Sequence, residues 1–436
     1  MSKQYFTPNE TIGRNDSESI QNAVDKAYET GVMNVTIPRM NERTGECVWL
    51  ITEGIRLPSG MCVTLDNCFM TLADDVMSNF FVSANAYTPD AYDKDKRMHG
   101  ITVRGIGTAE LNGGKPNELN ESTHLKNGLP PVTYNCPIFF INVEDFRVEN
   151  VRITDQRYWG MRFEFCSRGI IRDIFVCGIR DRRNQDGINL RNGCHDIVIE
   201  NVHGQTGDDM IALSAIDTKQ THAGNMIVDG LSWDIHDVVI HNISGAAITH
   251  PLVALRNHNG AKIYNITIEN VSDTPFVKEP AMYADIERYG IIRIGNNSYY
   301  SITPSVMGDT YNIRIRGINV NYSARGIVTQ ATLKNCSFEN INAGGVCRSI
   351  VAVTPENWAG AECGVKMENV TVDGVYFEAP KRKGTAVFDF SIMREDDFLH
   401  NVSLKNAVLK NVGRIADVDE SLTDCAITAE NMTLKY

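Results

Sequence analysis

One strand pattern recurs through most of this 436-residue chain. From about residue 101 onward, a β-branched pair, a polar residue, an Asn or Gly and a second apolar pair return, as in FRVENVRIT and HDIVIENVHG. The Asn or Gly positions lie between 23 residues (317 to 340) and 51 residues (150 to 201) apart, with one further repeat near Asp173 in the widest interval. They are Asn150, Asn201, Asn242, Asn270, Gly317, Asn340, Gly374 and Asn406. Strands that repeat at such a period without helical spacing predict a β-solenoid.

Each coil of a solenoid buries its inner face only against its neighbours. We therefore expect residues 1–436 to form a single all-β domain. The recurring Asn positions fit either stacked amide ladders or ordinary turn residues, and the pattern does not choose between them. The longer intervals indicate loops inserted at turns near a cleft, over residues 217–237 and 272–290.

The N-terminal segment has helical spacing instead. Apolar residues lie at Ile20, Ala23, Val24 and Ala27. Asp16 is a suitable N-cap and Gly31 a suitable end, so the sequence predicts a short capping helix over residues 16–30.

Charge and composition exclude several partners. The formal net charge is −12, which argues against nucleic acid and against an anionic membrane surface. No cysteine pair has the spacing of a zinc site, and no metal or cofactor is predicted. The N-terminus MSKQYFTPNETIG has no signal-peptide core, so we expect a cytoplasmic protein unless a signal was removed. The oligomeric state is left open.

Two short stretches carry acidic residues in matching contexts. RNQDGINLRNG contains Asp186, and GQTGDDMIAL contains Asp208 and Asp209, which follow 22 and 23 residues later. That spacing is one coil, so the three carboxylates are predicted to lie on adjacent coils. Clustered carboxylates repel one another and raise at least one pKa, as a general acid requires. Most glycoside hydrolases use a pair of carboxyl groups to cleave the bond. Either motif taken alone is explained equally well by exposed aspartates in turns.

These stretches resemble glycoside hydrolase family 28, the polygalacturonase group. NQDGIN is similar to the family's NTD motif and TGDDMIAL to its GDD motif. DSESIQNAVDKAYETGVMNVTIP and RYWGMRFEFCSRGIIRDIFV also resemble family segments. The resemblance covers most of the chain and implies a single-stranded, right-handed parallel β-helix.

The resemblance also implies residue roles. Asp208 would be the general acid, and Asp186 and Asp209 would position and deprotonate the attacking water. Direct attack by water inverts the anomeric centre. Asn184 would orient Asp186 by a hydrogen bond.

The chain departs from the family at the substrate-binding motifs. The GHG motif is absent, and AITHPLVAL offers His250 as its counterpart. The RIK motif appears as RIG, so Arg293 matches the arginine while Gly295 replaces the lysine. Arg256 and His258, in ALRNHNG, are an alternative place for the cation. All four of His250, Arg256, His258 and Arg293 are predicted to bind substrate.

The expected function is inverting, exo-acting cleavage of a pectin-derived or related oligosaccharide. Two alternatives remain. One is a polysaccharide lyase or epimerase on the same fold, which neutralises a uronate with arginine or Ca²⁺. The other is a carbohydrate-binding solenoid without activity.

Overall fold

The computed structural model describes residues 3–120, 129–178, 184–216, 228–248, 250–274, 290–295, 305–353, 366–381, 384–393, 396–418 and 425–435. They separate into two compact units. Unit 1 comprises Met1–Thr206 with Thr221–Ser232, and unit 2 comprises Gly207–Gln220 with Trp233–Tyr436. Each unit is described by itself. A single domain over residues 1–436 stays a prediction.

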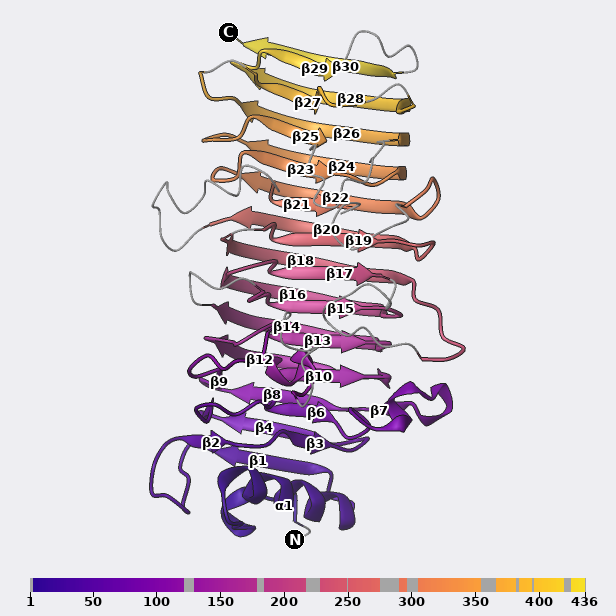
Figure 1. Cartoon of the computed structure of the whole chain (residues 1–436). Helices are drawn as coiled ribbons and strands as arrows, with labels where there is room; N and C mark the ends of the chain where they lie inside the picture. The colour runs from indigo at the N-terminus through magenta and orange to yellow at the C-terminus, as the bar shows by residue number, and fades with distance from the viewer. Residues whose placement is uncertain are drawn as a thin grey trace. The chain divides into compact units, whose positions relative to one another are not determined.

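Unit 1 is built from short parallel strands in two sheets (Figure 1). The first sheet contains β1 (Asn34–Pro38), β2 (Trp49–Ile51), β4 (Cys62–Asp66), β5 (Phe69–Leu72), β7 (Met98–His99), β8 (Thr102–Ile106), β9 (Glu110–Asn112), β11 (Val143–Glu144), β12 (Arg147–Thr154), β14 (Ser167–Cys177) and β16 (His195–Thr206). The second contains β3 (Ile55–Leu57), β6 (Phe81–Ser83), β10 (Ile138–Ile141), β13 (Met161–Glu164) and β15 (Ile188–Arg191). Short 3-10 helices lie at Pro8–Glu10, Pro89–Tyr92, Lys94–Lys96 and Val132–Asn135.

The core of unit 1 is made by side chains that stack from coil to coil. Val148 of β12 lies beside Ile171 of β14, which lies beside Ile199 of β16. All three are buried. The ring of Phe146 stacks on that of Phe163 with centroids 4.7 Å apart. Each buried apolar side chain of this size contributes roughly 1.5–3 kcal/mol relative to an exposed one.

The predicted capping helix is present as α1 (Asp16–Glu29) and packs against β1, β2 and β3. The prediction that Asp16 is the N-cap is wrong. Asn15 has the extended backbone of an N-cap, and its Oδ1 accepts the Glu18 amide at 2.8 Å. The Asp16 carboxylate instead accepts the Leu50 amide at 2.8 Å, which ties the first turn to β2. Gly31 follows the helix with φ = 72°, as its role at the end requires.

Unit 2 has the same construction, with longer strands. Its first sheet contains β18 (Ile235–Ala247), β20 (Ile263–Asp273), β22 (Thr310–Val320), β24 (Leu333–Ala343), β26 (Lys366–Glu378), β28 (Phe398–Lys410) and β30 (Cys425–Lys435). Its second contains β17 (Ile211–Ala215), β19 (Val253–Asn257), β21 (Ile292–Ile294), β23 (Arg325–Thr329), β25 (Ser349–Val353), β27 (Ala386–Phe390) and β29 (Arg414–Val418). Buried residues form one continuous row across six coils: Ile240, Ile268, Ile315, Phe338, Val372 and Leu404.

The recurring Asn and Gly positions turn the chain within each coil. All eight have positive φ, between 50° and 73°. Asn and Gly tolerate this left-handed conformation better than other residues. Asn270 also donates to the Oδ1 of Asn242 at 3.2 Å, and Asn401 donates to Asn369 at 2.8 Å in a parallel row. The two interpretations of these positions are therefore both correct.

The predicted loop insertions have different ends in the structure. β18 begins at Ile235, so the first insertion stops before that residue rather than at 237. β20 continues to Asp273, one residue past the predicted start of the second. Both strands are extended because their ends pair with the neighbouring coil. Residues 217–227 and 275–289 lie outside the described residues. No helix among the described residues is long and apolar enough to cross a membrane.

Candidate active site

The acidic pair of unit 2 lies at a bend directly before β17. Asp208 is 7% exposed and Asp209 is 1% exposed, so Asp209 lies deeper. The Asp209 amide donates to the Asp208 Oδ1 at 2.9 Å. This bend lets neighbouring acidic side chains face a common region, which a straight strand with alternating faces would prevent.

His250, predicted from a weak positional match, contacts the acidic pair. Its Nδ1 lies 3.1 Å from the Oδ1 of Asp208. The imidazole is 27% exposed, more than the carboxylate it contacts. The short segment before β19 therefore brings an imidazole to the first aspartate of the pair.

Arg256, in the middle of β19, contacts the second aspartate. Its Nη2 lies 2.5 Å from the Asp209 Oδ2, and both side chains are buried. Burial raises the pKa of Asp209 above its ordinary value. Arg256 opposes that rise, the Asp208 charge adds to it, and His250 opposes it. Asp209 thus has an environment that shifts its pKa toward the working range of a general base.

Arg293 lies on β21, one coil beyond Arg256, with Ala254 as its register partner on β19. Its Nη2 donates to Gln330 Oε1 at 2.6 Å and its Nε to the Gly295 carbonyl at 3.1 Å. The side chain is 2% exposed. These bonds fix the guanidinium on the outer side of the sheet.

The backbone explains why glycine replaces the family's lysine. Gly295 has φ = 87°, and a Cβ there would lie 2.6 Å from the Ala331 amide nitrogen. No side chain fits at this distance without a backbone shift. A lysine at this position would therefore strain the backbone.

His258 follows β19 and is completely buried. Neither ring nitrogen has a hydrogen-bond partner among the residues the structure describes. Burial, together with the nearby Arg256 charge, lowers the pKa of His258 to about 3. The imidazole is therefore neutral near pH 7. Its contact with a substrate stays a prediction.

Asp186 lies in unit 1, before β15, and is 3% exposed. Its Oδ2 accepts from the Asn189 Nδ2 at 3.1 Å. Its backbone carbonyl accepts from the Gly160 amide at 2.9 Å and from the Gln156 side chain at 3.1 Å. The sequence analysis did not predict Asn189 as a partner of Asp186. Its position three residues after Asp186 was the one feature of the sequence that could have indicated this contact. The role of Asn184, which has φ = 60°, stays a prediction.

The coil next to Asp186 carries a buried charged cluster that the sequence analysis missed. Arg162 donates to Glu164 through Nε at 2.6 Å, and neither side chain is exposed. The guanidinium carbons of Arg162 and Arg191 lie 5.1 and 4.9 Å from the Trp159 ring. Tyr158 stacks on the same ring with centroids 4.7 Å apart. The sequence MRFEF could have predicted this cluster, because charged residues inside an apolar strand require partners when they are buried.

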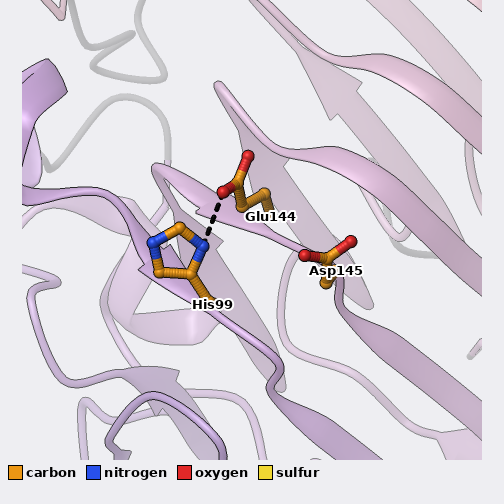
Figure 2. Close-up of side chains that lie close together, drawn as sticks. All are labelled: His99, Glu144 and Asp145. Atoms are coloured by element: carbon orange, nitrogen blue, oxygen red, sulfur yellow. Dashed lines mark ion pairs between the residues drawn. The ribbon is translucent and has the colours of Figure 1, made fainter.

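Another group in unit 1, shown in Figure 2, has ligand atoms close enough for a metal ion: His99, Glu144 and Asp145. Its charges are already paired. His99 lies 2.6 Å from Glu144, and Arg168 lies 2.8 Å from both carboxylates. A cation would have to displace Arg168, so this group is best explained as a surface ion-pair network.

Comparisons with known proteins agree with the predicted fold and with the resemblance to family 28. Residues 47–231 match the family model of glycosyl hydrolases family 28. That range contains Asp186, Asp208 and Asp209, whereas His250, Arg256, His258 and Arg293 lie beyond it. The chain is also 24% identical to polygalacturonase QRT2 of Arabidopsis thaliana over 127 residues, 28% of this chain and 29% of that protein.

Two solved structures match along nearly the whole chain. The family 28 exopolygalacturonase of Yersinia enterocolitica has a TM-score of 0.55 at 12% identity, over 99% of this chain and 78% of that one. The A-module of mannuronan C-5 epimerase AlgE6 of Azotobacter vinelandii has a TM-score of 0.61 at 10% identity, over 99% of both chains. The predicted right-handed parallel β-helix is confirmed, with a resemblance to glycoside hydrolase family 28. At these identities the solved structures establish the fold alone.

Proposed function

We propose that this protein is a glycoside hydrolase that cleaves a glycosidic bond in a pectin-derived or related oligosaccharide with inversion of configuration. The observation that carries the proposal is the contact between His250 and Asp208. It joins a family-like acidic motif to the best positional counterpart of the family's histidine motif. An aspartate that only forms a turn does not require a contact with a histidine from another coil, so this contact favours a catalytic role.

In this proposal, Asp208 is the general acid. It is the more exposed member of the pair, as a group that protonates the leaving oxygen must be. His250 orients its carboxyl group. Asp209 takes the proton of the attacking water.

The proposed substrate carries a negative charge. Arg293 is held by Gln330 and the Gly295 carbonyl, so its guanidinium is oriented before substrate arrives. Arginine binds carboxylates through paired hydrogen bonds. A uronate at the chain end fits this arrangement, and cleavage is proposed to proceed from that end.

The test is a substrate panel. Wild-type protein is incubated with pectic, other uronate-containing and neutral oligosaccharides, and the products are separated by size. We expect new reducing ends with stepwise release of the terminal sugar from uronate-containing members. An ultraviolet-absorbing unsaturated product would instead indicate a lyase, and inversion at C5 without chain cleavage would indicate an epimerase. Binding without any product would indicate a carbohydrate-binding solenoid.

A further inference from the structure

Arg256 was predicted to bind substrate, but its surroundings differ from those of an anchor at a binding surface. It is paired in register with Ser214 of β17, and both side chains are buried. Side chains alternate between the two faces of a strand. The neighbouring pair Leu213 and Leu255 faces the core, so Ser214 and Arg256 lie on the opposite face.

The two carboxylate oxygens of Asp209 have different surroundings. Oδ2 lies 2.5 Å from Arg256 Nη2. Oδ1 is buried and has no hydrogen-bond partner within the described part of the chain. The Ser214 Oγ, beside Arg256, is likewise buried without a partner. Buried polar atoms normally have partners, so these atoms indicate a place for water or a ligand oxygen.

We propose that Arg256 is a positioning residue, which holds Asp209 ionised and turns its Oδ1 toward the water that attacks the glycosidic bond. This inference rests on the proposed hydrolase function and names a role that the family motifs do not include. Arg256 thereby leaves recognition of the substrate's charge to Arg293. The guanidinium occupies one oxygen and leaves the other to accept the proton.

The charges around Asp209 support this division. The groups of unit 2 that affect it are Arg256, Asp208 and His250. Asp208 opposes ionisation of Asp209, and His250 is already 3.1 Å from Asp208. Arg293, on the next strand, is bonded to Gln330 and the Gly295 carbonyl. Arg256 is therefore the permanent cation that compensates the buried Asp209 carboxylate.

The first test needs no activity. Thermal unfolding of the full chain is measured from pH 4 to pH 8 for Arg256→Gln, Asp209→Asn, the double variant and the control Arg314→Gln. Arg314 is the matched control because it pairs with Glu339 in unit 2 while half-exposed. Without Arg256, the folded-state pKa of Asp209 rises further above its unfolded value. The ionised form is then disfavoured in the folded state, so stability is lost as pH rises.

We expect the Tm of Arg256→Gln to fall by about 5 °C relative to wild type near pH 7 and by much less near pH 4. In the Asp209→Asn background this pH dependence should disappear. A Tm loss that is independent of pH, or that persists without Asp209, would assign Arg256 a packing role and overturn the proposal. Arg314→Gln should change little at any pH.

The second test uses the pH dependence of kcat/KM. In Arg256→Gln the acid limb should move to higher pH by about one to three units, because the base loses its cation. Arg256→Lys should restore part of that shift. A higher KM for anionic substrates with an unmoved acid limb would show substrate anchoring instead. Absence of activity in wild type would refute the proposed function, while the unfolding data would still decide whether Arg256 keeps Asp209 ionised.

Discussion

The Nδ1 of His250 lies 3.1 Å from the Oδ1 of Asp208, although the two residues belong to different coils of unit 2. The contact depends on the pairing of β17 with β19, which aligns Ile211 with Val253. Each residue precedes its strand by three positions. The register of the solenoid therefore brings these two residues, which are far apart in the sequence, into contact.

Replacing Asp208 with Asn should remove the general acid while keeping the shape of the side chain. We expect kcat to fall about 10²- to 10⁴-fold, with the Tm within a few degrees of wild type. The loss should be smaller on an aryl glycoside, whose leaving group needs little protonation. Kinetics on both substrate types check this. An equal loss on both would assign Asp208 a different role.

Replacing His250 with Ala should remove a partner of the acid but not the acid itself. We expect a smaller fall in kcat than in Asp208→Asn, roughly 10- to 100-fold, with little change in KM. The double variant His250→Ala/Asp208→Asn should be no worse than Asp208→Asn alone, because the histidine acts through that carboxyl group. Additive losses would mean that His250 acts independently of Asp208.

Replacing Arg293 with Gln should weaken the binding of a charged substrate. We expect KM for a uronate oligosaccharide to rise roughly 10- to 150-fold, the value of one charged hydrogen bond. KM for any neutral substrate should change little. Arg316→Gln is the control, since Arg316 forms a partly exposed pair with Glu269. A similar loss on neutral substrates would show that Arg293 supports the fold rather than charge recognition.

Replacing Gly295 with Ala should destabilise the protein by more than about 2 kcal/mol. A Cβ at this position would meet the Ala331 backbone at 2.6 Å in addition to the strain of φ = 87°. Gly384→Ala is the control, because Gly384 has φ = 78° with nothing within 4 Å of its Cβ. Chemical denaturation of both variants checks the difference. Equal stability of the two would contradict the close approach at Gly295.

The coil architecture could be predicted because its signal is local. The turn positions need a left-handed backbone, and Asn or Gly marks most of them, as at Asn340 with φ = 56° and Gly374 with φ = 69°. Asn340 and Gly374 also show a cross-coil constraint: a Cβ at Gly374 would lie 2.9 Å from the Asn340 Oδ1. Glycine therefore occupies the turn position where the side-chain amide of the neighbouring coil leaves no room for a Cβ atom.

The charged partners could not be predicted in the same way, since they depend on which strands and segments fold against one another. The pairing of Arg256 with Asp209 requires the register of β17 and β19. The cluster of Arg162, Glu164 and Trp159 requires the folding of one strand and the segment before it. Asp16 was wrongly predicted to be the N-cap of α1, because the partner of its carboxylate, the Leu50 amide, lies in another element. Local patterns locate the acids, and tertiary pairing decides their neighbours.

The most direct test of the proposed reaction is proton NMR of the first product formed by wild-type protein from a defined uronate oligosaccharide. An inverting hydrolase must release a reducing sugar whose anomeric configuration is opposite to that of the cleaved bond. The opposite anomer should therefore appear before mutarotation equalises the two forms. A first product that retains the configuration would contradict direct attack by water.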